Sequence, residues 1–135
     1  MLLLDTHAWV WSKAHDARLG RVTERLLNRA AIQNALRVSP VSFFEVATLH
    51  ANHRIHFDRT LEQWIVEATQ DVRLAELTPE AAIDAGYIVR SALPDPMDRL
   101  LVATARRLDA MFITADRAIL AYARGGEVRV HDASR

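Results

Sequence analysis

Acidic residues follow two of the most apolar stretches of this chain. Asp5 directly follows the run Met1–Leu4, and Asp116 comes two residues after the run Ala110–Thr114. Short, unbroken apolar runs are typical of strands that are buried on both faces of a parallel sheet. Ligands of open α/β sheets bind outside the carboxyl ends of the strands. Both carboxylates are therefore predicted to face one crevice.

Two further acids are candidates for the same crevice, although each also fits a role in capping a helix. Glu45 lies one turn into a helix that follows a short predicted strand at Val38, and the segment Asp95–Asp98 begins another helix. Glu45 stands three residues after Ser42, which is a capping-box pattern. Asp98 can be a first-turn acid that the helix dipole favours. Taken singly, each acid is more often a cap than a ligand.

Carboxylates that converge on one crevice must either take up protons or bind a cation. Two like charges ~4 Å apart repel by about 4 kcal/mol at a typical effective dielectric constant. Oxygen ligands in a chain without cysteine select a hard divalent ion such as Mg²⁺ or Mn²⁺. Magnesium keeps several waters and takes ligands from substrate phosphates. An acid cluster of this kind is suited to phosphodiester hydrolysis.

Predicted strands and helices alternate along the chain, which favours a parallel sheet covered on both faces. Strands are predicted at 1–4, 37–39, 72–77, 110–114 and 128–130. Helices are predicted at 8–14, 21–36, 42–50, from residue 60 onward, and at 78–93, 95–108 and 116–122. The expected fold is an α/β class, three-layer α/β/α sandwich with a central, mainly parallel sheet. No repeat or linker divides residues 1–135, so we expect a single domain.

Composition narrows the class of function. The 17 basic residues are balanced by 17 acidic ones, which counts against a protein that coats nucleic acid but permits an enzyme that touches few phosphates. The absence of cysteine excludes disulfides and thiolate metal sites and agrees with a reducing cytoplasm. No apolar run is long enough for a signal peptide or a membrane span. We therefore expect a cytoplasmic protein without a membrane partner.

Four segments of the sequence carry a family resemblance. They are LLLDTHAWVW, SPVSFFEVATL, DPMDRLLVATARRL and FITADRAILAY. In order and spacing they resemble a PIN-domain ribonuclease, specifically a VapC-type toxin of a toxin–antitoxin system, over nearly the whole chain. The resemblance implies an endoribonuclease that depends on Mg²⁺ or Mn²⁺, is often a homodimer, and is held inactive by a cognate VapB-type antitoxin.

The resemblance also implies the site residues, and it places Asp98 at the same rim as the other acids. The family's four acidic positions, which bind metal and serve catalysis, fall on Asp5, Glu45, Asp98 and Asp116. The hypothesis makes Asp5 and Asp98 the main ligands, with the other two completing the shell directly or through water. Only Pro94 separates the preceding predicted helix from the Asp-Pro motif, so Asp95 is a rival to Asp98; we prefer Asp98 as the ligand and Asp95 as the cap.

Several neighbours of these acids have two interpretations. Thr6 and Thr114 could orient the carboxylates. Arg99 and Arg117 could contact the RNA backbone, although a solvated helix face is favoured for both. The tryptophans at 9 and 11 could stack on bases, but core or interface positions are commoner. The histidines at 50, 53 and 56 do not all lie on one helix face, which favours a surface helix and turn over a zinc-binding site.

A second function remains open: a catalytically weak PIN fold that binds RNA or a protein partner. Phosphodiester chemistry also does not choose between RNA and DNA, because the contacts to the 2′-hydroxyl that distinguish them cannot be read from a sequence.

Overall fold

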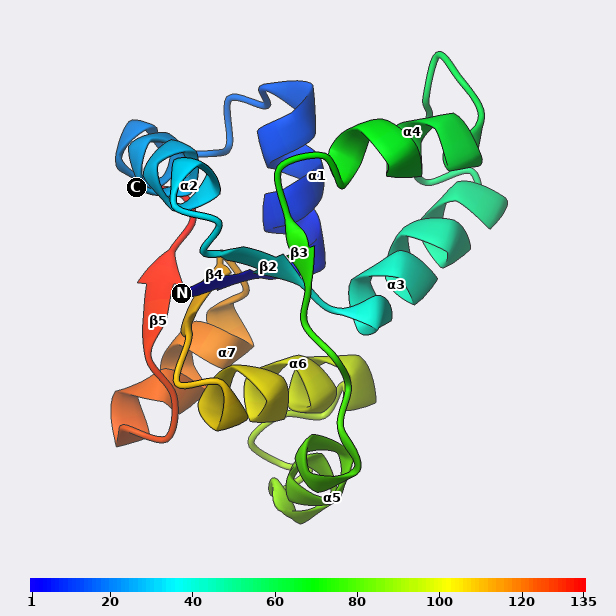
Figure 1. Cartoon of the computed structure of the whole chain (residues 1–135). Coiled ribbons are helices and arrows are strands. Elements are labelled where there is room, and N and C mark those ends of the chain that lie inside the picture. Colours follow the sequence, from blue (N-terminus) through cyan, green and yellow to red (C-terminus); the bar gives the residue numbers. More distant parts are fainter.

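The computed structural model describes residues 1–135 and contains one five-stranded sheet (Figure 1). The strand order is β3-β2-β1-β4-β5, and every neighbouring pair is parallel. The strands are β1 (Leu2–Leu4), β2 (Leu36–Val38), β3 (Arg73–Leu74), β4 (Met111–Thr114) and β5 (Val130–Asp132). The predicted parallel sheet is confirmed, and all parallel crossovers require the helices that alternate with the strands.

The first strand lies at the centre of the sheet, and both of its faces are covered. Leu3 and Leu4 have no exposed surface, and they pair in register with Phe112 and Ile113 of β4. Leu3 and Phe112 belong to one hydrophobic cluster, whereas Leu4 and Ile113 belong to the other. Side chains of a strand alternate between the faces of a sheet. This burial on both sides is why the run contains no polar residue.

Helices form a layer on each face of the sheet (Figure 1). One layer contains α1 (Thr6–Ala14), α2 (Arg21–Ile32), α3 (Pro40–Ala51) and α4 (Leu61–Ala68), and the other contains α5 (Pro79–Tyr87), α6 (Pro96–Arg107) and α7 (Arg117–Tyr122). A short 3₁₀ helix, η1 (Ala123–Gly125), follows α7. The α/β/α sandwich that the sequence predicted is therefore confirmed.

Several predicted boundaries are wrong because tertiary pairing ends elements that local patterns would extend. The helix predicted at 21–36 ends at Ile32, since Asn34 is left-handed (φ 54°) and Leu36 pairs with β1. The helix predicted at 78–93 ends at Tyr87, because Ile88 is extended (ψ 128°). In the strand predicted at 72–77 only two residues pair, and the last strand lies two residues later than predicted, at 130–132.

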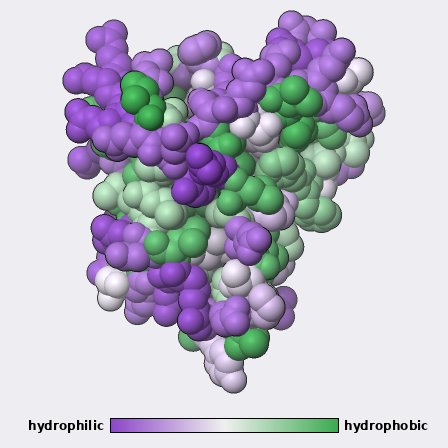
Figure 2. Space-filling model, in the orientation of Figure 1, coloured by the Kyte–Doolittle hydropathy of each residue, from purple (hydrophilic) through white to green (hydrophobic).

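The surface carries both hydrophilic and apolar side chains (Figure 2). Figure 2 shows hydrophilic residues around a band of apolar surface on the face where β3 lies in Figure 1. Both residues of this short edge strand are exposed, and Leu74 keeps 56% of its surface accessible. No helix has the length and apolar character needed to cross a membrane.

Candidate active site

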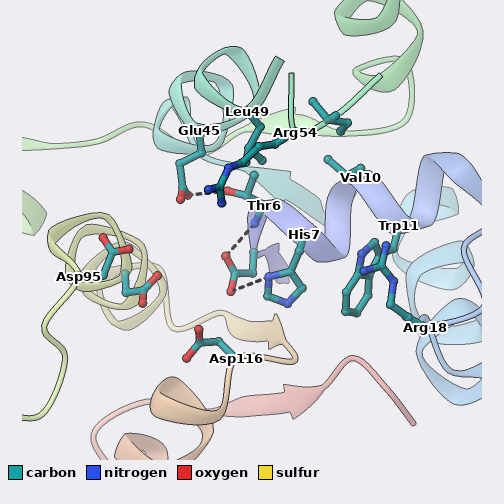
Figure 3. A pocket seen from close by; sticks show the side chains of 13 residues that line it. Thr6, His7, Val10, Trp11, Arg18, Glu45, Leu49, Arg54, Asp95 and Asp116 are labelled. Atoms are coloured by element: carbon teal, nitrogen blue, oxygen red, sulfur yellow. Dashed lines mark hydrogen bonds and ion pairs between the residues drawn. The ribbon is translucent and has the colours of Figure 1, made fainter. Parts of the chain in front are cut away.

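The structure brings the four predicted acids together in one pocket at the carboxyl end of β1 (Figure 3). They come from four separate parts of the chain, and Asp95 lies beside them. The four are Asp5, Glu45, Asp98 and Asp116. In Figure 3, Glu45 and Asp116 enter the pocket from opposite sides, with Asp95 on a third. Residues as far apart in the sequence as Asp5 and Asp116 thus form one acidic centre.

Asp5 and Asp116 reach the pocket because their strands are parallel neighbours. Leu4 of β1 pairs with Ile113 of β4, so both strands end at the same rim. Each acid also caps the helix that follows it. Asp5 Oδ1 accepts from the Thr6 amide (2.8 Å), and Asp116 Oδ1 accepts from two amides at the start of α7 (2.9 and 3.1 Å). Capping and membership of the acidic centre are therefore compatible, since a cap uses one carboxylate oxygen.

Glu45 does not belong to a capping box, and that interpretation of the sequence is wrong. The N-cap of α3 is Ser39, whose Oγ accepts from the Val41 amide at 3.1 Å. Ser42 is instead buried inside the helix, with its Oγ 2.9 Å from the hydroxyl of Thr6. That Thr6 hydroxyl donates to Glu45 Oε1 at 2.7 Å. Glu45 is thus directed into the pocket and not back toward the helix start.

The structure separates the roles of the two acids in the Asp-Pro motif. Asp95 is the N-cap of α6, and its Oδ1 accepts from the Met97 amide at 2.8 Å, as predicted. Asp98 lies in the first turn of α6, half-buried, with no capping bond of its own. Both line the pocket. Its free, half-buried carboxylate makes Asp98 the better candidate for a ligand.

Two side chains, those of Thr114 and His7, lie against the buried carboxylate of Asp5. Thr114 donates its hydroxyl to Asp5 Oδ2 at 2.7 Å and accepts from the amide of Asp116 at 3.0 Å. The His7 ring accepts from the Ala115 amide through Nε2 (2.9 Å), which leaves the proton of a neutral ring on Nδ1, 3.6 Å from Asp5 Oδ2. The predicted orienting role of Thr6 and Thr114 has this geometric basis, and Ser42 joins them.

Burial and mutual repulsion disfavour full ionisation of the acids. Burial raises the pKa of Asp5, against the lowering effects of His7 and of the hydrogen bonds from Thr114 and Thr6. Burial also raises the pKa of Glu45. The pKa of Asp98 rises to about 7, first through burial and then through the four other carboxylates of the pocket. A cation in the pocket would relieve this repulsion.

The donor set fits a hydrated divalent ion. No group of three or more Asp, Glu, His or Cys side chains is arranged so as to hold a metal ion on its own. Magnesium, however, is usually bound by one or two carboxylates together with water and substrate phosphate. Carboxylate oxygens with raised pKa values match that requirement. The histidine triplet forms no metal site, and His50 stacks on Phe57 with ring centroids 5.7 Å apart.

Other pocket residues differ from those that the sequence suggested. Arg99 and Arg117 do not line the pocket, whereas Arg18 and Arg54 do. Arg117 is exposed, as the favoured interpretation of a solvated helix face predicts. That interpretation is wrong for Arg99, which is half-buried and whose Nε is buried without a hydrogen-bond partner. Both of the latter lie in connections between helices, where no periodic pattern marks them. Trp11 also lines the pocket. The tryptophan at position 9 is instead fully buried in the core.

Comparisons with known proteins agree with this architecture. A PIN-domain family model matches residues 2–125. The chain is 32% identical over 116 residues to Ribonuclease VapC22 of Mycobacterium tuberculosis, covering 86% of this chain and 87% of that protein.

Solved structures share the fold at low sequence identity. VapBC2 from Rickettsia felis bound to a DNA fragment from its promoter superposes with a TM-score of 0.68 at 15% identity, covering 97% of each chain. FitAcB from Neisseria gonorrhoeae gives 0.65 at 17% identity, covering 98% of each chain. DNA-bound VapBC from Salmonella typhimurium gives 0.64 at 18% identity, covering 97% of this chain and 96% of that one. On the family match and the 32% identical relative, the chain belongs to the PIN-domain family and is a homologue of the VapC ribonucleases.

Proposed function

We propose that this protein is a metal-dependent endoribonuclease, a VapC-type toxin that hydrolyses RNA phosphodiester bonds. The observation that carries the proposal is the convergence of the four acids, with Asp95, in one pocket of a chain homologous to a ribonuclease. The raised pKa of Asp98 supports a site built for a cation. An inactive binding module would have no need of such a repulsive cluster.

The proposed ligands are the four acids that meet in the pocket. Asp5 and Asp98 hold Mg²⁺ or Mn²⁺, with Glu45 and Asp116 completing the shell directly or through water. A bound divalent ion supplies a Lewis acid that activates water and stabilises the leaving oxygen. Asp5 keeps Oδ2 oriented by the Thr114 hydroxyl, and Glu45 keeps Oε1 oriented by Thr6. These bonds reduce the reorganisation needed when substrate binds.

We also propose that this protein is a cytoplasmic toxin with a protein partner. VapBC and FitAB neighbours are solved as complexes on DNA, and by analogy we propose a VapB-type antitoxin as the partner of this chain, which we also propose to be a homodimer. Large apolar side chains on the surface, including Phe44 (61% exposed) and Tyr87 (85% exposed), provide area for protein contacts. RNA is the proposed substrate because the 32% identical relative, VapC22, is a ribonuclease.

The test is cleavage of RNA by the purified chain with Mg²⁺, with Mn²⁺ and with EDTA. Cleavage should require the metal and should be lost in Asp98→Asn and Asp5→Asn. Glu62→Gln is the matched control, because Glu62 is an exposed acid of α4 outside the pocket. RNA binding without cleavage under every condition would favour the binding-module alternative. Cleavage of a DNA strand of equal sequence at the same rate would reject RNA as the preferred substrate.

A further inference from the structure

An arginine and a tryptophan form a cationic surface at one end of the acidic pocket. Trp11 lies in α1 and is half-buried, and the guanidinium carbon of Arg18 lies 4.7 Å from the centroid of its ring. Both side chains line the pocket, as Figure 3 shows. Arginine stacks on the face of an aromatic ring through its planar, delocalised cation. The pair therefore presents a guanidinium backed by an indole.

This surface is held in place before any ligand binds. The Asp16 carboxylate accepts two hydrogen bonds from Arg18, one from Nε (3.0 Å) and one from Nη2 (2.8 Å). These bonds occupy the edge of the guanidinium. The Arg18 side chain still keeps 67% of its surface exposed. On the other side, the His7 ring packs against Trp11 with centroids 4.8 Å apart, and His7 in turn faces Asp5. The pair is thus linked to the acidic centre through a chain of direct contacts.

A second arginine lies on another side of the pocket. Arg54 follows the end of α3, and Figure 3 shows it extending toward the side of the pocket where Glu45 lies. It forms no ion pair with any carboxylate of the chain, although five acids line the same pocket. A polyanion that approaches these acids needs positive charge along its path. Arg54 is a free cation in a position to supply it.

We propose that Trp11 and Arg18 form a stacking platform for one nucleobase next to the cleaved phosphate, while Arg54 binds a phosphate on the other side. Single-stranded RNA is bound in this way, with unstacked bases on aromatic or guanidinium planes and phosphates on cations. The proposal rests on the ribonuclease function and describes how the strand is positioned across the acids. Stacking of this kind accepts any base, so the platform sets the position of the strand and not its sequence.

The experiment compares two ligands of equal charge, each carrying a fluorescent dye. One is a 12-nucleotide RNA of mixed sequence, and the other is a 12-mer of abasic spacers with the same number of phosphates. Anisotropy is measured with Ca²⁺ in place of Mg²⁺, and gel electrophoresis checks that the RNA stays intact. The native chain should prefer the RNA by about tenfold, which is the loss expected when one stacked base is removed.

The variants separate stacking from charge. Trp11→Leu and Arg18→Gln should both abolish the preference for RNA, whereas Trp11→Phe, which keeps an aromatic support, should retain it. Arg54→Gln should weaken both ligands equally and reduce the slope of log affinity against log salt by about 0.7, the value for one phosphate contact. Arg25→Gln is the matched control, because Arg25 is an exposed arginine of α2 outside the pocket and without an ion pair.

Two outcomes overturn the platform. One is equal binding of RNA and abasic spacer, or binding of neither, by the native chain. The other is a preference that survives in Arg18→Gln and Trp11→Leu. Arg18 is exposed, so its replacement tests the proposal even where Trp11→Leu does not fold. Cleavage of RNA by a native chain that shows no base preference would reject the platform and keep the enzyme. Base-dependent binding without cleavage in Mg²⁺ or Mn²⁺ would keep the platform and reject the proposed ribonuclease activity.

Discussion

Replacing Asp98 by Asn should stabilise the metal-free protein at neutral pH. Burial raises the pKa of this group from 3.8 to about 7, together with the four surrounding carboxylates of Asp5, Asp95, Asp116 and Glu45. The rise corresponds to about 4 kcal/mol if it is taken in full. Because Asp98 is only half-buried, solvent screens the interaction, and we expect about 2 kcal/mol. For a chain of this size, that is a Tm higher by roughly 5 to 8 °C.

The sign of the effect follows from the direction of the pKa shift. Below about pH 4, Asp98 is protonated in both the folded and the unfolded state and costs nothing. Above pH 4 the unfolded chain releases this proton while the folded chain retains it until about pH 7, so the native fold loses stability across that interval. The gain from Asp98→Asn should therefore be absent at pH 4 and complete at pH 8.

The assay is thermal unfolding in EDTA at pH 4, 6 and 8 for the native chain and for Asp98→Asn. Asp84→Asn is the control, because the pKa of the partly exposed Asp84 is lowered by its hydrogen bonds to Arg107. That variant should be unchanged or slightly less stable at pH 8. An Asp98→Asn protein that is no more stable than the native chain at pH 8, or whose gain does not depend on pH, would refute the reasoning that burial and neighbouring carboxylates disfavour the charged form of Asp98.

Three further changes test the site and its support. Mn²⁺ at about 100 times its dissociation constant should raise the free energy of unfolding of the native chain by about 3 kcal/mol in thermal melts; a similar rise in the double variant Asp5→Asn/Asp98→Asn would show that the ion binds elsewhere. Thr114→Val removes the hydroxyl that donates to Oδ2 of the buried Asp5 carboxylate and should cost about 1 to 3 kcal/mol in urea unfolding, with Thr114→Ser close to native. Equal losses in both variants would implicate packing instead. Trp9→Phe removes a fully buried indole whose Nε1 donates to a backbone carbonyl, so the free energy of unfolding should fall by about 2 to 3 kcal/mol. RNA binding by the folded protein should stay native, and weakened binding would place this residue in the RNA path.

Local chemistry was sufficient to predict much of the architecture. The apolar runs before Asp5 and Asp116 indicated strands buried on both faces, because a strand with both faces in the core is made of nearly continuous apolar residues. The starts at Thr60, Thr78 and Asp95 are caps whose side chains bond to amides two or three residues on, so a few neighbouring residues determine them. The alternation of strand and helix then implied a parallel sheet with helices on both faces.

Only the tertiary structure decided which groups meet. The order of the strands brings β1 between β2 and β4, and this places Asp5, Glu45 and Asp116 at one rim although they are far apart in the chain. The same packing ended two helices early and made Ser39, rather than Ser42, the cap of α3. Repulsion and burial act through space, so the raised pKa of Asp98 has no counterpart in any local pattern.

The arginines also show that sequence position alone does not determine which side chains enter the pocket. Arg99 and Arg117 stand next to acids of the site in sequence, yet the helices turn them away from the pocket. Arg18 and Arg54 lie in connections and enter it. Sequence spacing determines the direction of a side chain within a helix or strand, because the backbone repeats there. In a connection the backbone does not repeat, so the path of the folded chain alone determines what such a residue reaches.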